Sequence, residues 1–92
     1  MPGPEIETVN VGDEAKSRVT WLINELALEY DLSYWHLFVY GYPERAALEI
    51  TVTAPDHVKF QRQFTEAQLT SLAIRELVEA QYDRWRNRAS LG

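Results

Sequence analysis

The segment that most constrains the fold is YWHLFVYGY, residues 34–42. Rings and aliphatic side chains alternate along it, and successive side chains of a β-strand point to opposite faces of the sheet. Trp35, Leu37 and Val39 are therefore expected on one face. The opposite face carries a column of rings: Tyr34, His36, Phe38, Tyr40 and Tyr42. This pattern predicts a sheet with one buried side and one side rich in aromatic residues.

Two later segments alternate in the same way. Residues 46–54 place aliphatic and polar side chains on opposite faces, and residues 57–64 alternate apolar residues with polar ones such as Lys59. The turn sequences PER and PD separate the three strands. Because such short connections make consecutive strands antiparallel neighbours, we expect a three-stranded antiparallel meander with the second strand in its centre.

An amphipathic helix is expected on either side of these strands in the sequence. Apolar residues of the segment 13–30 recur at spacings of three and four, which makes one apolar stripe, and Asp13 can cap its first turn. The second helix is expected to begin after Thr65, because Gln68 completes a capping box, and to run to about Asn87. The chain is therefore predicted to be an α+β protein in the order helix, three strands, helix (αβββα), with both helices packed on one face of the sheet.

The length of 92 residues predicts one domain. Residues 1–12 contain two prolines and two glycines, so we expect a flexible N-terminal arm that can include a short edge strand at residues 7–11. Residues 13–88 are expected to form the single α+β domain, and residues 89–92 a frayed tail.

The helix, three-strand, helix order resembles that of double-stranded-RNA-binding domains in topology alone. Those domains carry basic residues at the start of their second helix, where this sequence reads TEAQ at residues 65–68. The topology therefore does not carry an RNA-binding function over to this chain.

The charge of the chain disfavours nucleic acid as a partner. The formal net charge is −5, with only 9 lysines and arginines, and an acidic chain repels phosphate backbones unless its cations gather on one face. The segment RWRNR at residues 84–88 is the nearest approach to a basic patch, and it also suits the C-terminal end of a helix dipole. The lack of cysteine, of a long apolar run and of a signal-peptide pattern predicts a cytoplasmic protein without a membrane segment.

Residue sets typical of catalysis or metal binding are not found in the sequence. His36 and His57 are expected on strands that are not neighbours, and Glu49 is the only strand carboxylate that could join them. The serines lack a histidine and an acid at a recognisable spacing, and the glycines are scattered. We therefore predict a protein that is not an enzyme, with no catalytic residue, no cofactor and no metal site.

The column of rings allows three interpretations. It can be a solvated cross-strand ladder, because tyrosine favours strands and its hydroxyl tolerates water. It can be a contact surface for a protein, since aromatic residues are the preferred anchors of interfaces. It can also stack on the bases of a single-stranded nucleic acid, although Glu49 shares that face and Lys59 is its one strong cation.

Both helices carry apolar residues outside their expected core stripes. Trp21 and Leu28 lie on the polar side of the first helix, either under the N-terminal arm or as anchors for a partner. The second helix is apolar on two sides, one of which includes Tyr82 and Trp85. One side is expected to face the sheet, and the other to face either the first helix or a neighbouring chain, which would make a two-fold dimer.

These surfaces predict a non-enzymatic protein-binding module. A small acidic inhibitor or accessory protein, of the kind that mobile elements encode, would occupy a surface of a larger nucleic-acid-handling complex, guided by its negative charge. The alternative is a single-stranded nucleic-acid-binding domain that uses the aromatic sheet face. The expected partner is another protein, a second copy in a homodimer, or both. The candidate partner-binding residues come from three surfaces between which the sequence does not decide: Trp21, Leu28, Tyr34, His36, Phe38, Tyr40, Tyr42, Lys59, Tyr82 and Trp85.

Overall fold

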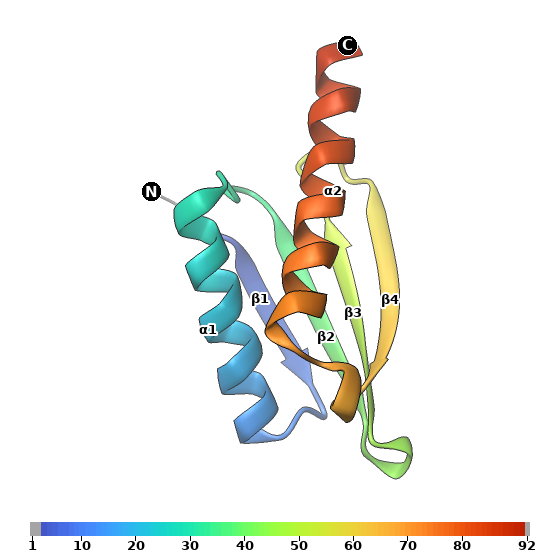
Figure 1. Ribbon diagram of the computed structural model, residues 1–92. Helices are drawn as coiled ribbons and strands as arrows, with labels where there is room; N and C mark the ends of the chain where they lie inside the picture. Colours follow the sequence, from blue (N-terminus) through green and yellow to red (C-terminus); the bar gives the residue numbers. More distant parts are fainter. Residues whose placement is uncertain (1–2, 92) are drawn as a thin grey trace.

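A four-stranded sheet with two helices on one of its faces makes up the fold (Figure 1). The computed structural model describes residues 3–91. The elements follow in the order β1 (Glu5–Val9), α1 (Asp13–Glu29), β2 (His36–Tyr42), the 3₁₀ turn η1 (Pro43–Arg45), β3 (Ala47–Thr53), β4 (Lys59–Thr65), the 3₁₀ turn η2 (Glu66–Gln68) and α2 (Ser71–Leu91). The α+β class is confirmed, and α2 packs on the sheet as expected.

The predicted three-stranded meander is wrong in its strand count, because the sheet has a fourth strand in the order β1-β2-β3-β4. Strands β2, β3 and β4 pair antiparallel. Strand β1 comes from the segment expected as a loose arm, and it pairs parallel with β2, with Glu5 opposite His36. A parallel pair needs a long crossover connection, which α1 supplies. The chain therefore begins with a βαβ unit and not with a free helix.

The prediction that Asp13 caps the first helix is wrong, because Asp13 is already the first residue of the helix. Gly12 is the N-cap and supplies no side-chain acceptor, while Asp13 and Glu14 lie in the first turn, where the helix dipole favours negative charge. The helix ends at Glu29, because Tyr30 is already extended.

The capping box formed by Thr65 and Gln68 is present, but it begins η2 and not the long helix. Helix α2 starts at Ser71, after Thr70, whose side-chain oxygen accepts a hydrogen bond from the backbone N–H of Ala73 at 3.1 Å. The helix continues to Leu91, beyond the end expected at Asn87, and its last turns extend past the sheet (Figure 1).

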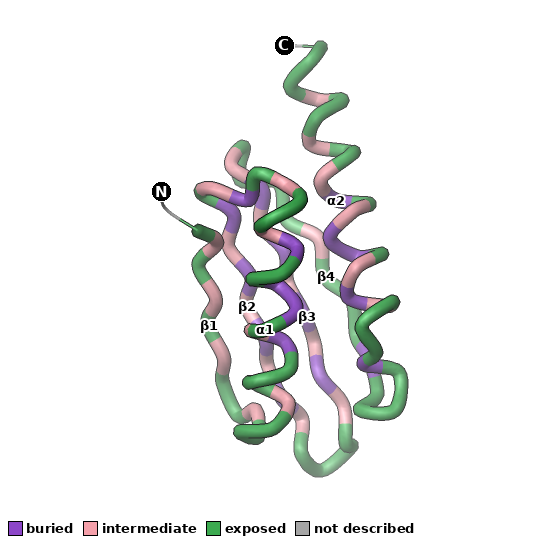
Figure 2. The backbone as a smooth tube through the Cα atoms, turned by 60° about the vertical axis from the view of Figure 1, so that its left-hand side comes forward, coloured by how far each residue is buried: buried purple, intermediate pink, exposed green. Residues whose placement is uncertain are grey.

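The core lies between the helices and one face of the sheet. Figure 2 shows buried residues alternating with half-buried ones along β2 and β3, as the alternation in the sequence predicts. Burial of each such aliphatic side chain stabilises the fold by about 1.5–3 kcal/mol. The main contributors are Val19, Ile23 and Leu26 from α1, Leu37, Val39, Leu48, Ile50, Val52 and Phe64 from the strands, and Ile74, Leu77 and Val78 from α2.

Two ion pairs fasten α2 to its neighbours. Arg75 donates hydrogen bonds of 2.8 and 2.9 Å to both carboxylate oxygens of Glu29 on α1, and this contact holds the pKa of Glu29 below its ordinary value. Arg88 donates bonds of 2.8 and 3.3 Å to Asp56 in the β3–β4 turn, which likewise lowers the pKa of Asp56.

Among the described residues, neither helix combines the length and the apolar character that crossing a bilayer requires.

Candidate functional site

The face of the sheet opposite the helices is covered by neither of them (Figure 1). We call it the open face and define it by the outward-pointing positions of the four strands. These are Glu5, Glu7 and Val9 of β1, His36, Phe38, Tyr40 and Tyr42 of β2, Ala47, Glu49, Thr51 and Thr53 of β3, and Lys59, Gln61, Gln63 and Thr65 of β4.

Three rings of β2 form a column of successive contacts near the middle of the open face. The ring centroids of Phe38 and Tyr40 are 6.5 Å apart, and those of Tyr40 and Tyr42 are 5.0 Å apart. The guanidinium of Arg45 lies 4.3 Å from the ring centroid of Tyr42, within the range of a cation–π contact. All three rings are half-buried, although no helix lies over them. The rings therefore order one another and present a preformed apolar surface.

Carboxylates flank this column on both sides. Glu7 of β1 is the register partner of Phe38, and Glu49 of β3 is the register partner of Tyr40. The amide of Gln63 donates a hydrogen bond of 3.2 Å to Glu49. With Glu5 included, three carboxylates and a single lysine, Lys59, occupy the strand positions of the open face. The open face is therefore acidic, which opposes the approach of phosphate groups.

A pocket of about 580 Å³ lies at one end of the open face, where β1 and β2 begin and β3 ends. Glu5, Tyr34, His36 and His57 are among its lining residues. Tyr34 and His57 both have left-handed backbones, with φ angles of 68° and 67°. Such a conformation costs an L-residue about 1–2 kcal/mol, so the surrounding contacts must hold it.

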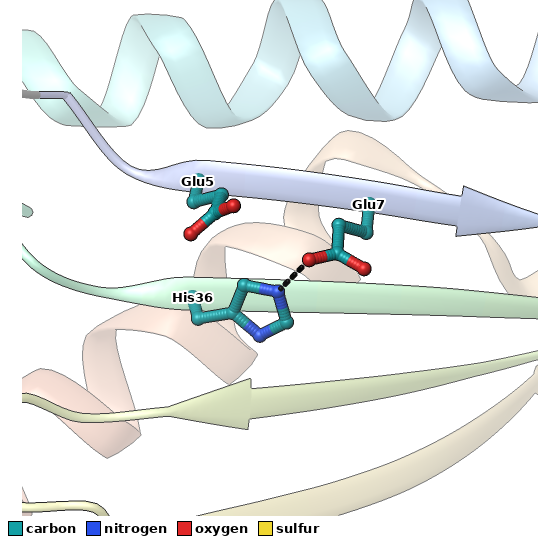
Figure 3. A group of neighbouring side chains, drawn as sticks. All are labelled: Glu5, Glu7 and His36. Atoms are coloured by element: carbon teal, nitrogen blue, oxygen red, sulfur yellow. Dashed lines mark hydrogen bonds and ion pairs between the residues drawn. The ribbon is translucent and has the colours of Figure 1, made fainter.

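Glu5, Glu7 and His36 form a cluster at this corner (Figure 3). Both carboxylates point from β1 toward the imidazole on β2, and Nε2 of His36 lies 3.0 Å from a carboxylate oxygen of Glu7. One ligand atom from each residue can be chosen so that all of them lie within 4.8 Å of one another. Among residues 3–91, this is the group of histidine and carboxylate side chains that lie close enough together to hold a metal ion.

The structure brings together five of the predicted site residues, namely His36, Phe38, Tyr40, Tyr42 and Lys59, on the open face. Tyr34 was expected in the same column, but it precedes β2 and lies in a left-handed turn. Its side chain is 77% exposed beside the pocket and does not stack with the other rings.

Tyr82 and Trp85 lie away from the open face. They project from α2 into an aromatic cluster that also contains Tyr30 and Trp35. Their rings pack on Trp35 with centroid distances of 6.0 and 5.6 Å, and Tyr82 also contacts Tyr30 at 5.0 Å. Both residues are half-buried by these contacts. The second apolar side of the helix is therefore largely occupied by residues of the same chain.

Trp21 and Leu28 project from the outer side of α1 and are 62% and 81% exposed. Trp21 borders a small pocket of about 290 Å³ between the two helices, together with Arg75. This degree of exposure excludes the interpretation in which the described part of the N-terminal segment covers Trp21.

Glu5 and Glu7 were not predicted as members of the candidate site. A signal for them was present, since EIETV alternates polar and apolar residues as an edge strand does. Pro4 and Gly3 in front of it favoured the interpretation as a loose arm.

Neither family models nor curated proteins assign a role to these residues. No family model matches the chain, and no curated protein matches its sequence. Their roles are therefore inferred from position, charge and packing.

Proposed function

We propose that this protein is a non-enzymatic protein-binding module whose contact surface is the open face. The observation that carries the proposal is the column of contacting rings of Phe38, Tyr40 and Tyr42 on a sheet face that neither helix covers. Large aromatic side chains are the preferred anchors of protein interfaces. On a strand that only faces solvent, charged side chains would be expected among the rings. The outward positions of β2 carry no lysine, arginine, aspartate or glutamate.

The rings are held in a way that suits binding. Strand β2 lies between β1 and β3, so its backbone is hydrogen-bonded on both sides. Tyr40 contacts a ring on each side along the strand. Side chains that are already ordered lose little conformational entropy when a partner covers them, which favours affinity.

The charge of the open face specifies the chemistry of the partner. Glu5, Glu7 and Glu49 surround an apolar centre, so a complementary surface has an apolar patch bordered by lysine or arginine. The net charge of −5 adds long-range attraction to a basic surface. A small acidic inhibitor or accessory protein that occupies the basic surface of a nucleic-acid-handling complex, as mobile elements encode, meets both conditions.

A second copy of the chain is the other partner that a specific observation favours. Trp21 and Leu28 are exposed on the outer side of α1, away from the acidic open face. A two-fold dimer through this side would bury both residues in an isologous contact. Face-to-face pairing of two open faces would bring like charges together, so the homodimer is proposed through α1.

Single-stranded nucleic acid is the competing ligand for the open face. The rings could stack on bases, but the flanking carboxylates repel the phosphates that accompany them. A titration with short single strands at low salt distinguishes the two cases. If the strands quench tyrosine fluorescence and this quenching disappears in Tyr40→Thr, the open face binds nucleic acid. That result would contradict the protein-binding proposal.

Interaction with protein partners is tested by capture from cells that carry the gene, followed by calorimetry with the purified partner. The double variant Phe38→Thr, Tyr40→Thr keeps strand-forming residues at both positions and removes the rings. We expect affinity to fall by roughly 1,000-fold, since each of the two anchor residues contributes about 2 kcal/mol and about 1.4 kcal/mol corresponds to a factor of ten. Leu72→Ala is the matched control, because it removes an exposed apolar side chain that belongs to neither proposed contact surface.

Partner binding that survives the double variant and is lost in Trp21→Ala would place the contact on α1. Light scattering of the wild type, Phe38→Ala, Trp21→Ala and Trp85→Ala tests the homodimer separately. A dimer that only Trp21→Ala dissociates supports the α1 contact, and a wild type that is monomeric at about 100 μM removes it.

A further inference from the structure

We propose that Glu5, Glu7 and His36 form a binding site for a divalent zinc ion at the corner of the open face. The proposal goes beyond protein binding and does not depend on it. It starts from the cluster in Figure 3, where one imidazole and two carboxylates from neighbouring strands offer ligand atoms within 4.8 Å of one another.

The positions of the three ligands follow from the strand register. Glu5 and Glu7 are two residues apart on β1, so both side chains point to the open face. Glu5 is the register partner of His36 on β2. Ligands supplied by paired strands are held more rigidly than ligands on loops, which lowers the cost of organising the site.

The distances are close to those that zinc requires. Zinc–nitrogen and zinc–oxygen bonds of about 2.0–2.2 Å in a tetrahedron place neighbouring ligand atoms about 3.3–3.5 Å apart. One of the three ligand pairs is already close to this spacing, since Nε2 of His36 and the nearer oxygen of Glu7 are 3.0 Å apart. The ligand atoms of the remaining pairs lie within 4.8 Å. Glu5 and Glu7 are both exposed, so rotation about their side-chain bonds can complete the approach.

The donor set selects the class of ion. Calcium and magnesium prefer shells made only of oxygen, whereas an imidazole with carboxylates suits zinc. The double positive charge would also offset the repulsion between two neighbouring carboxylates. Three protein ligands leave the fourth position open, and the pocket of about 580 Å³ that Glu5 and His36 line gives room for water there.

Isothermal titration of the full, tag-free chain with zinc chloride tests the site. We expect one ion per chain, no corresponding signal with magnesium chloride, and at least about ten-fold weaker zinc binding in His36→Gln, Glu5→Gln and Glu7→Gln. His57→Asn and Glu49→Gln are the matched controls, which replace the other histidine and the other open-face carboxylate. Asparagine is chosen at position 57 because it tolerates the left-handed backbone of His57.

Imidazole nitrogen NMR of the wild type gives a readout that does not depend on the folding of any variant. Zinc is expected to shift the Nε2 resonance of His36 and to leave the ring of His57 unchanged. The proposal is overturned if saturating zinc leaves the His36 resonances in place. It is also overturned if a folded His36→Gln binds zinc as the wild type does, or if His57→Asn is the variant that loses binding.

Discussion

Gly41 of β2 lies directly beneath the backbone carbonyl of Asn10, so closely that a methyl group on Gly41 would overlap that oxygen. Asn10 belongs to the connection between β1 and α1, and its own backbone is left-handed, with φ of 56°. Gly41 itself is buried. The glycine that interrupts the alternation of β2 is therefore required by the close crossing of the chain that joins β1 to α1.

Gly41→Ala is expected to destabilise the protein by about 1–3 kcal/mol, the usual cost of forcing an extra methyl group into a packed site. For a domain of this size the melting temperature would fall by about 4–8 °C for each kcal/mol. Urea unfolding followed by circular dichroism measures the change. Gly3→Ala is the control, because nothing lies within 4 Å of the added methyl group and Gly3 caps no helix. Equal stability of the two variants would contradict the close crossing.

Leu37 and Phe38 are neighbours on opposite faces of β2, and their truncation should have very different costs. Leu37 is 2% exposed in the core, so Leu37→Ala is expected to lose about 2–5 kcal/mol. Phe38 contacts mainly its neighbours on the open face, so Phe38→Ala should lose only about 1 kcal/mol. Chemical unfolding of both variants gives the comparison. A larger loss of unfolding free energy in Phe38→Ala than in Leu37→Ala would mean that Phe38 is buried and that the open face is covered.

Local pattern was sufficient to predict the strands of the antiparallel part of the sheet. Alternation along β2 and along β3 separates core residues from residues of the open face, and this depends only on neighbours in the sequence. The short edge strand allowed at residues 7–11 lies at Glu5–Val9, and its parallel pairing was not predicted, because the segment is five residues long and its partner β2 lies beyond the whole of α1. The preference of such a short segment is decided by a partner that local pattern does not reveal.

Local pattern also predicted the site residues of β2 correctly, but it could not predict the contacts of the site residues on α2. The column of Phe38, Tyr40 and Tyr42 follows from a period of two within one strand. The surroundings of Tyr82 and Trp85 depend on which element faces the later turns of α2. Trp35 fills that place, immediately before β2, and no spacing in the sequence links it to α2.

Trp21 is expected to contribute most of the tryptophan fluorescence that comes from solvent-exposed rings. It is 62% exposed, whereas Trp35 is 1% exposed and Trp85 is half-buried against it. Trp21→Phe should shift the emission maximum of the folded protein to shorter wavelength and remove most of the quenching by acrylamide. Trp85→Phe is the control, and it should leave the quenchable component in place. Unchanged quenching in Trp21→Phe would show that another surface covers Trp21 in solution.

Stability is expected to fall with acid, and the contact between Glu29 and Arg75 contributes to that fall. The pKa of Glu29 lies below its ordinary value of 4.5, mainly because of the hydrogen bonds from Arg75. The unfolded chain therefore binds more protons than the folded protein in this range, so stability decreases as pH falls. The contribution of the contact is present above about pH 4.5 and is lost as pH falls through the lowered pKa of folded Glu29.

Glu29→Gln should accordingly be less stable than the wild type at pH 7, and the two stability curves should converge below the lowered pKa. Asp56 adds a second acid-sensitive contribution through Arg88 in both proteins, so each curve still declines. Urea unfolding at several pH values measures the difference between the curves. Glu76→Gln on α2 is the matched control, because no ion pair joins Glu76 to another of the residues 3–91. A Glu29→Gln curve that stays parallel to the wild type down to pH 2 would contradict the assigned role of the contact, because its carboxylate would then have no part in the decline.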